Sequence, residues 1–194
     1  MNTNAIHSAS GRSQMDQKRH TVRAGHRSGN GAFIGTIGGL VGTMVMDLVL
    51  MGALSAVGLP ALTCFSIVGN TVARFLSILG IEMAGGVPLG VATHYLIGPL
   101  IGAIFGVAVT QVDALRVDTW KKGIILAVVY VEILSQPILA TTPILLKMTT
   151  PETLQWFGGS FVMHLMWGVV LGLVMSYGLR LGIGAIMEKI LGRL

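Results

Sequence analysis

Charged side chains are scarce in this sequence: Asp, Glu, Lys and Arg make up only 11% of its 194 residues, whereas hydrophobic residues make up 53%. A soluble domain carries about 25% charged residues, so the composition excludes an ordinary water-soluble globular domain. A mean hydropathy of +0.77 instead predicts a chain that is largely surrounded by lipid. The length is that of a single domain.

Cysteine is almost absent as well. The single cysteine, Cys64, excludes an internal disulfide and any metal site built from several cysteines. The sequence also lacks a phosphate-binding loop, a dinucleotide-binding glycine motif, a nucleophile elbow and a zinc-protease motif. These absences favour a protein that is not an enzyme.

The first 30 residues form a polar, basic segment in which Asp16 is the only acidic residue. Such a composition buries too little apolar area to fold alone, so we expect residues 1–30 to be a disordered tail and residues 31–194 to be the membrane domain. The Ser- and Arg-rich character also resembles an organelle transit peptide, which is an alternative. A cleavable signal peptide is not expected, because the apolar run that follows is too long.

Four apolar segments are long enough for a helix that crosses a bilayer, which takes about 20 residues. They cover approximately residues 32–57, 87–110, 123–146 and 159–181. Residues 61–80 have apolar residues at steps of three and four, a spacing typical of an amphipathic helix that lies in the membrane interface. The predicted fold is an all-α polytopic membrane protein, namely a four-transmembrane-helix bundle with an external amphipathic interfacial helix.

The positions of Lys and Arg support four spans. With the N-terminus inside, 11 of the 13 Lys and Arg residues are cytoplasmic, and only Arg74 and Lys147 are outside. Positive charge stays on the cytoplasmic side of membrane proteins, so we expect cytoplasmic N- and C-termini. The net charge of +5 is then explained by orientation and by contact with anionic lipid, and nucleic acid is not an expected partner.

Glycines spaced four residues apart predict close contacts between helices, because small residues let helix backbones approach each other in lipid. The candidate packing residues are Gly35 and Gly39 in the first span, Gly98 and Gly102 in the second, and Gly168 and Gly172 in the fourth. Four helices of this length enclose a small interior. Besides the lipid bilayer, the expected partners are therefore a second copy of the chain or a larger membrane complex.

Ionisable residues inside the spans are the most informative feature, because a charge at this depth is costly. The first and third spans carry Asp47 and Glu132, the second and fourth carry His94 and His164, and Gln136 lies one turn beyond Glu132. Both histidines begin the pattern H-x-x-x-G-x-x-x-G, seventy positions apart. This repeat predicts two hairpins related by an axis along the membrane normal, as in some transporters.

Such a set of residues has several chemical uses. The leading hypothesis is a relay that handles protons, ions or a small solute. A structural or accessory subunit of a membrane complex is the alternative, in which the polar residues join helices and no cofactor is bound. A third possibility is a redox protein, with His94 and His164 as ligands of a divalent metal or of haem b.

Prolines interrupt the third span near its end. Pro137 and Pro143 each remove a backbone donor, so we expect the helix to be disrupted there. Thr141 and Thr142 are expected to satisfy the freed carbonyls.

Several short motifs between residues 90 and 180 resemble the YagU-like bacterial inner-membrane proteins. They are Ala92-Thr93-His94, Trp120-Lys121-Lys122-Gly123, Pro137 with Thr142-Pro143, and Met163-His164-Leu165-Met166-Trp167. The resemblance implies a small multi-span protein of the bacterial cytoplasmic membrane with two membrane histidines. The resemblance provides no enzymatic activity that could be carried over to this chain, and it leaves the chemistry open. It does not extend to Asp47.

Overall fold

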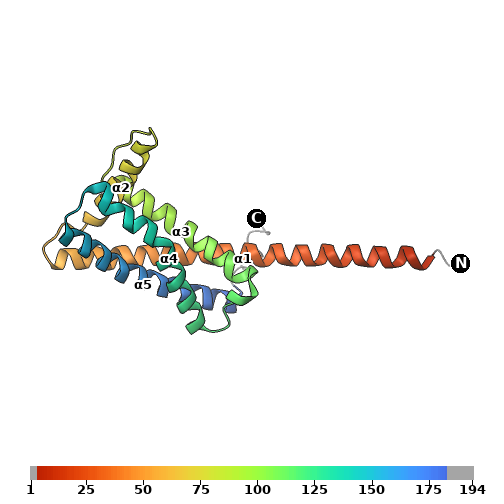
Figure 1. Ribbon diagram of the computed structural model, residues 1–194. Coiled ribbons are helices and arrows are strands. Elements are labelled where there is room, and N and C mark those ends of the chain that lie inside the picture. The colour runs from red at the N-terminus through yellow and green to blue at the C-terminus, as the bar shows by residue number, and fades with distance from the viewer. Residues whose placement is uncertain (1–3, 183–194) are drawn as a thin grey trace, which may run out of the picture.

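The structure is a computed structural model that describes the backbone of residues 4–182 and the side chains of residues 29–182. This part of the chain is helical and contains no strand (Figure 1). Its elements are α1 (Asn4–Ala56), α2 (Thr63–Ile78), α3 (Val87–Gln111), the short 3-10 helix η1 (Asp113–Leu115), α4 (Trp120–Leu146) and α5 (Thr150–Leu181). The predicted all-α fold is confirmed.

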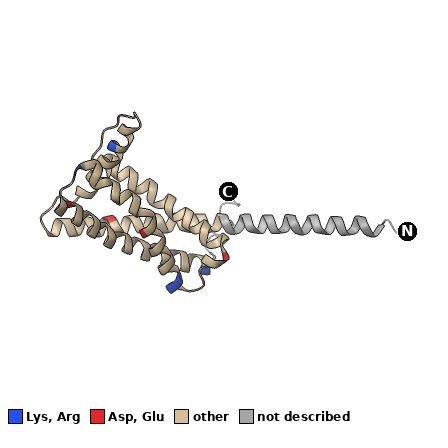
Figure 2. Cartoon of the chain, viewed as in Figure 1, with Lys and Arg blue, Asp and Glu red and all other residues tan. Residues whose placement is uncertain are grey.

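Four of these helices are long and apolar enough to cross a membrane: the part of α1 from Gly29 to Ala56, and the whole of α3, α4 and α5. Large apolar side chains point away from the bundle; Leu48, Leu96 and Ile133, for example, are 68%, 70% and 69% exposed. Lys and Arg residues lie toward the two ends of the bundle in Figure 2, and the acidic residues between them are few. This is the pattern of a polytopic bundle surrounded by lipid, as predicted.

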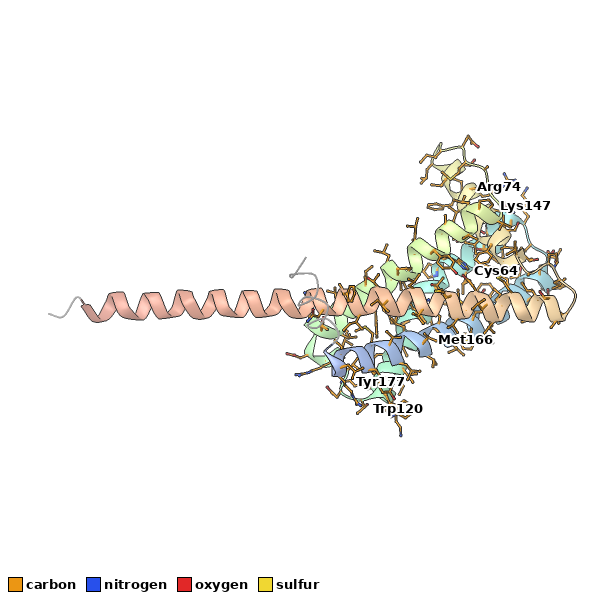
Figure 3. All side chains as sticks on the ribbon, turned by 180° about the vertical axis from the view of Figure 1, so that it is seen from behind. Cys64, Arg74, Trp120, Lys147, Met166 and Tyr177 are labelled. Atoms are coloured by element: carbon orange, nitrogen blue, oxygen red, sulfur yellow. The ribbon has the colours of Figure 1, made fainter. Side chains whose placement is uncertain are left out.

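The two ends of the bundle differ in their side chains. Arg74 and Lys147 lie at one end, and Trp120 and Tyr177 lie at the opposite end (Figure 3). Trp120 and Tyr177 are 45% and 53% exposed, and exposed Trp and Tyr are typical of a membrane–water boundary. We refer below to the Arg74 end and the Trp120 end.

Two helix starts differ from the sequence-based expectation. Helix α5 begins at Thr150 rather than at about residue 159, because Thr149 and Glu152 form a capping box and Pro151 occupies the first turn. Helix α1 begins at Asn4, within the segment whose composition predicts disorder. The side chains of residues 1–28 lie outside the described residues. The prediction that this segment is a basic cytoplasmic tail therefore stays a prediction.

The bundle consists of two helix hairpins, α1 with α3 and α4 with α5, and α1 also packs against α5. Glycines bring the paired helices together. A Cβ atom on Gly35 or Gly39 of α1 would collide with the backbone of Gly102 or Gly98 of α3. Where helix backbones touch in this way, association depends on close van der Waals packing rather than on burial of apolar area.

The second hairpin uses the same kind of contact. A Cβ atom on Gly168 would lie 2.8 Å from Cα of Val128, and one on Gly172 would lie 2.5 Å from Cα of Ile124. Here α5 supplies the glycines and α4 supplies larger residues. The glycines that the sequence spacing selects are therefore the residues at both close contacts.

Helix α2 is more deeply involved in the bundle than an external interfacial helix would be. It packs against α3 and α4, and Phe65, Gly69 and Thr71 are buried. Its second half has exposed apolar side chains, including Phe75 and Ile78 at 54% and 70% exposure, as expected at a membrane interface. Only this second half matches the prediction.

Helix α4 runs without a break through both of its prolines. Pro143 has no N–H to donate to the carbonyl of Leu139, and the indole Nε1–H of Trp156 on α5 donates to that carbonyl instead, at 3.1 Å. The hydroxyls of Thr141 and Thr142 donate to the carbonyl of Ile138. The prediction that these threonines satisfy the carbonyl freed by Pro143 was therefore wrong.

Candidate functional site

Asp47 of α1 and His94 of α3 form a partly buried pair between the two helices. The Nδ1 atom of His94 lies 2.9 Å from Oδ1 of Asp47. The side chains of His94 and Asp47 are 14% and 4% exposed. With the carboxylate as acceptor, Nδ1 carries the hydrogen, and the other ring nitrogen of His94 is free for a second partner.

Glycine packing one turn away sets this geometry. A Cβ atom on Gly98 would collide with the hydroxyl of Thr43. Thr43 precedes Asp47 by one turn of α1, and Gly98 follows His94 by one turn of α3. Because residues four apart lie on one face of a helix, the same close contact between Gly98 and Thr43 points the imidazole at the carboxylate.

The start of α2 covers this pair. The ring of Phe65 meets the ring of His94 edge-on, with centroids 5.1 Å apart. Cys64 precedes Phe65 on α2, outside the four spans, and burial raises the pKa of its thiol to about 12, with a further contribution from the nearby charge of Asp47. The thiol is therefore neutral at physiological pH. Sequence reasoning missed this contact, although Gly69 and Gly90, which let α2 and α3 approach each other, were available as a signal.

On the side toward the Trp120 end, the pair is followed by a hydrogen bond between α5 and α1. The indole Nε1–H of Trp167 donates to Oγ1 of Thr43 at 3.1 Å, and that hydroxyl donates to the carbonyl of Gly39 at 2.9 Å. Trp167 and Thr43 are 3% and 1% exposed. Beyond them lie the fully buried Leu171 and Met175. Neither Thr43 nor Trp167 was among the residues that the sequence selected.

Glu132 and Gln136 are neighbours on α4. The amide Nε2 of Gln136 donates to Oε2 of Glu132 over 3.4 Å, which is long for a hydrogen bond. His164 lies on α5, within electrostatic range of His94. Among the predicted site residues, then, the structure joins Asp47 to His94 and Glu132 to Gln136, and it brings the two histidines into the same region.

Helix registers place all four ionisable residues at one level of the bundle. Gly42 of α1 packs against Trp167 of α5, so that one turn further toward the Arg74 end Asp47 is level with residues 163 and 164. The contact of Gly168 with Val128 puts Glu132 at the level of His164 by the same reasoning. We call Asp47, His94, Glu132 and His164 the polar layer.

Three atoms of the polar layer are buried without a hydrogen-bond partner: Oδ2 of Asp47, Oε1 of Glu132 and Nδ1 of His164. Buried polar atoms normally have at least one partner, and each exception requires an explanation. All three belong to groups that bind or release a proton.

Within residues 29–182, no group of three or more His, Cys, Asp and Glu side chains is arranged to hold a metal ion. The two imidazoles and two carboxylates therefore do not form one ligand set. A divalent metal or haem b held by His94 and His164 stays an untested prediction.

Comparison of the chain with protein-family models, with curated proteins and with solved structures gives no significant match.

Proposed function

We propose that this protein handles protons within the membrane, and that the polar layer is the place where they bind. The observation that carries the proposal is the partly buried hydrogen bond between Asp47 and His94, together with three buried proton-binding atoms that have no partner. Ionisable residues inside a membrane are costly, and they commonly mark proton or ion pathways.

The types of side chain favour protons over other cargo. Imidazole changes its charge near neutral pH more readily than any other side chain, and a carboxylate beside it accepts the proton that the imidazole releases. A relay between such groups needs only short transfers between neighbouring oxygen and nitrogen atoms. A larger solute would need a wider space lined by more polar groups.

The packing on either side of the layer suggests how protons are exchanged. Toward the Trp120 end, the contact between Trp167 and Thr43 and the buried Leu171 separate the layer from the membrane boundary. This arrangement favours exchange with the Arg74 end. Transfer across the whole membrane then requires the contact between Trp167 and Thr43 to open.

Proton flux into proteoliposomes tests the proposal. The full-length protein is reconstituted with a pH-sensitive dye inside the vesicles, and a pH gradient is imposed from outside. Glu132→Gln and His94→Gln are expected to lower the flux to that of empty vesicles. Glu82→Gln is the matched control, because Glu82 is an exposed carboxylate whose partner is Ser77, outside the spans.

Flux that is equal in the wild type, in the two layer variants and in empty vesicles would refute the proposal. Loss of flux in Glu82→Gln as well would show that the layer is not its source. The second candidate function is that of a structural or accessory subunit, which the close glycine contacts between the helices favour.

Asp47→Asn separates these two functions. The Asn amide still accepts a hydrogen bond from His94, but it cannot ionise. Proton handling therefore predicts a variant that is as stable as the wild type and carries no flux. A purely structural role predicts that Asp47→Asn assembles normally and that Asp47→Leu does not, with co-purification of a larger complex as the readout.

We further propose that the chain lies in a bacterial cytoplasmic membrane with the Trp120 end inside. In the predicted topology, the Trp120 end carries Lys121, Lys122 and Arg180, and the Arg74 end carries Arg74 and Lys147. The larger number of basic residues at the Trp120 end agrees with the positive-inside rule. Labelling of single cysteines placed at the two ends with a membrane-impermeant reagent tests this orientation. Membership of the YagU-like family is part of the same proposal.

A further inference from the structure

The two hairpins share one packing register, counted from the glycines of the histidine helices. In the first hairpin, Gly98 of α3 packs against Thr43 of α1. In the second hairpin, Gly168 of α5 packs against Val128 of α4. Each glycine follows a histidine by four residues, and each partner precedes a carboxylate by four residues.

This shared register places Glu132 opposite His164. In an antiparallel pair of helices, one turn back along one helix faces one turn forward along the other. The rule holds in the first hairpin, where it leads from the contact of Gly98 with Thr43 to the hydrogen bond between His94 and Asp47 at 2.9 Å. Applied to the contact of Gly168 with Val128, it leads to His164 and Glu132.

The unpartnered atoms supply an independent observation. Oε1 of Glu132 and Nδ1 of His164 are both buried and both lack a partner. They are the atoms that correspond to Oδ1 of Asp47 and Nδ1 of His94. A carboxyl oxygen and an imidazole nitrogen left open on facing helices are complementary, since one proton between them satisfies both atoms.

We infer that Glu132 and His164 form a second carboxylate–imidazole pair, which shares a proton across the α4–α5 contact as Asp47 and His94 do across the α1–α3 contact. The role of this pair in moving protons rests on the proposed function, whereas the pairing itself is argued from the helix contacts and the unpartnered atoms. In the described conformation, Oε2 of Glu132 accepts the long hydrogen bond from Gln136, whereas Oε1 has no partner. Glu132 can therefore keep Gln136 as a partner on its own helix while Oε1 pairs with His164 on α5.

Proton transfer between Glu132 and His164 needs no other reactant. With Glu132 protonated, its O–H donates to Nδ1 of His164. When the proton passes to that nitrogen, the imidazole becomes a cation and the carboxyl becomes an anion. The new N–H then donates to the carboxylate, so the total charge of the pair is unchanged.

Among the described residues, titratable groups on α1, α2 and α3 lie near this pair. His94 of α3 is within electrostatic range of His164, and Asp47 of α1 is bonded to His94. Cys64 of α2 and Tyr95 of α3 lie near Asp47. A positive charge on His94 opposes a positive charge on His164, so the first pair influences when the second pair takes up a proton.

A double-mutant cycle on the full-length protein tests the pairing without any flux measurement. Glu132→Leu, His164→Leu and the double variant are unfolded with SDS from detergent micelles. Polar contacts between membrane helices are worth about 0.6 kcal/mol on average and about 1.7 kcal/mol at most, which is about a three- to eighteen-fold change in the unfolding equilibrium constant. We expect the effects of the two substitutions to be non-additive by a factor in that range.

Two further cycles calibrate the result. Asp47→Leu combined with His94→Leu is the positive control, because these residues are hydrogen-bonded. Glu82→Leu combined with His164→Leu is the negative control, because Glu82 is exposed, has Ser77 as its partner and lies outside the spans. Additive effects of Glu132→Leu and His164→Leu, together with a non-additive first pair, would overturn the inference.

A second measurement applies even where the leucine variants fail to fold. The wild-type protein and Glu132→Gln are both labelled with ¹⁵N-histidine. We expect the Nδ1 resonance of His164 to differ between the two proteins. An unchanged Nδ1 resonance would overturn the pairing. A shift of this resonance, together with a wild-type protein that carries no proton flux, would support the pairing and refute the proposed function. Proton flux in the wild type without a shift would support the proposed function and refute the pairing.

Discussion

Replacement of Gly39 by alanine tests whether backbone contact between α1 and α3 holds the first hairpin together. A Cβ atom at this position would collide with the carbonyl oxygen of Gly98, and it would also lie 2.9 Å from the carbonyl carbon of Gly98 and 3.0 Å from Cα of Pro99. All three atoms belong to the backbone, so no side chain can rotate away. The two helices must separate to accommodate the methyl group.

The magnitude follows from two opposing contributions. Forcing extra atoms into a packed interior costs about 1–3 kcal/mol, and the upper value applies at Gly39 because only backbone is displaced. Alanine is a better helix former than glycine by about 1 kcal/mol. The net destabilisation of Gly39→Ala is therefore about 2 kcal/mol, or about a thirty-fold increase in the unfolding equilibrium constant.

Gly52→Ala is the matched control on the same helix. Nothing lies within 4 Å of a Cβ atom at Gly52, so only the helix preference acts, and this variant is expected to equal or exceed the wild type in stability. Both variants are compared by SDS unfolding, followed by circular dichroism. If Gly39→Ala were as stable as Gly52→Ala, the inference that the glycines hold the helices in backbone contact would be refuted.

Three further predictions concern single side chains. Thr43→Val leaves the buried indole N–H of Trp167 without its acceptor, and we expect a loss of about 1 kcal/mol in SDS unfolding. Trp156→Phe leaves the carbonyl of Leu139 without a donor, with a similar loss of about 1 kcal/mol by the same assay. Burial raises the pKa of Cys64 to about 12, so at pH 8 we expect its thiol in the folded protein to react with maleimide roughly a thousand-fold more slowly than in the SDS-unfolded protein. The rate in the folded protein is expected to increase as the pH rises. Equal rates in the two states would contradict the burial of the thiol.

Sequence alone predicted the four long apolar helices and the glycines at their contacts. Both are encoded locally: a span requires about 20 consecutive apolar residues, and a close contact requires small residues that recur on one helix face. The same spacing indicated that His94 lies on the face of α3 that carries Gly98 and Gly102. This is why the residues of the polar layer could be selected before their contacts were known.

The contacts within the layer could not be predicted in the same way. Whether Asp47 meets His94 or His164 depends on helix rotation, and a rotation by one residue changes the direction of a side chain by about 100°. The insertion of Phe65 beside His94 depends on the path of the loop before α2. The bond from Trp156 to the carbonyl of Leu139 joins two helices, and no pattern within either helix indicates it.

The position of Asp47 and His94 across a helix contact has a mechanical consequence. Asp47 and His94 lie on different helices, so a change in their protonation alters the attraction between α1 and α3. Toward the Trp120 end, these helices are held by glycine contacts of backbone against backbone, which leave no room for adjustment. Toward the Arg74 end, the ring of Phe65 contacts His94, and a Cβ atom on Gly90 of α3 would collide with the backbone of Phe65. Close backbone packing therefore lies on both sides of the pair, and under the proposed function we expect the helices to keep this packing when the protonation of the pair changes.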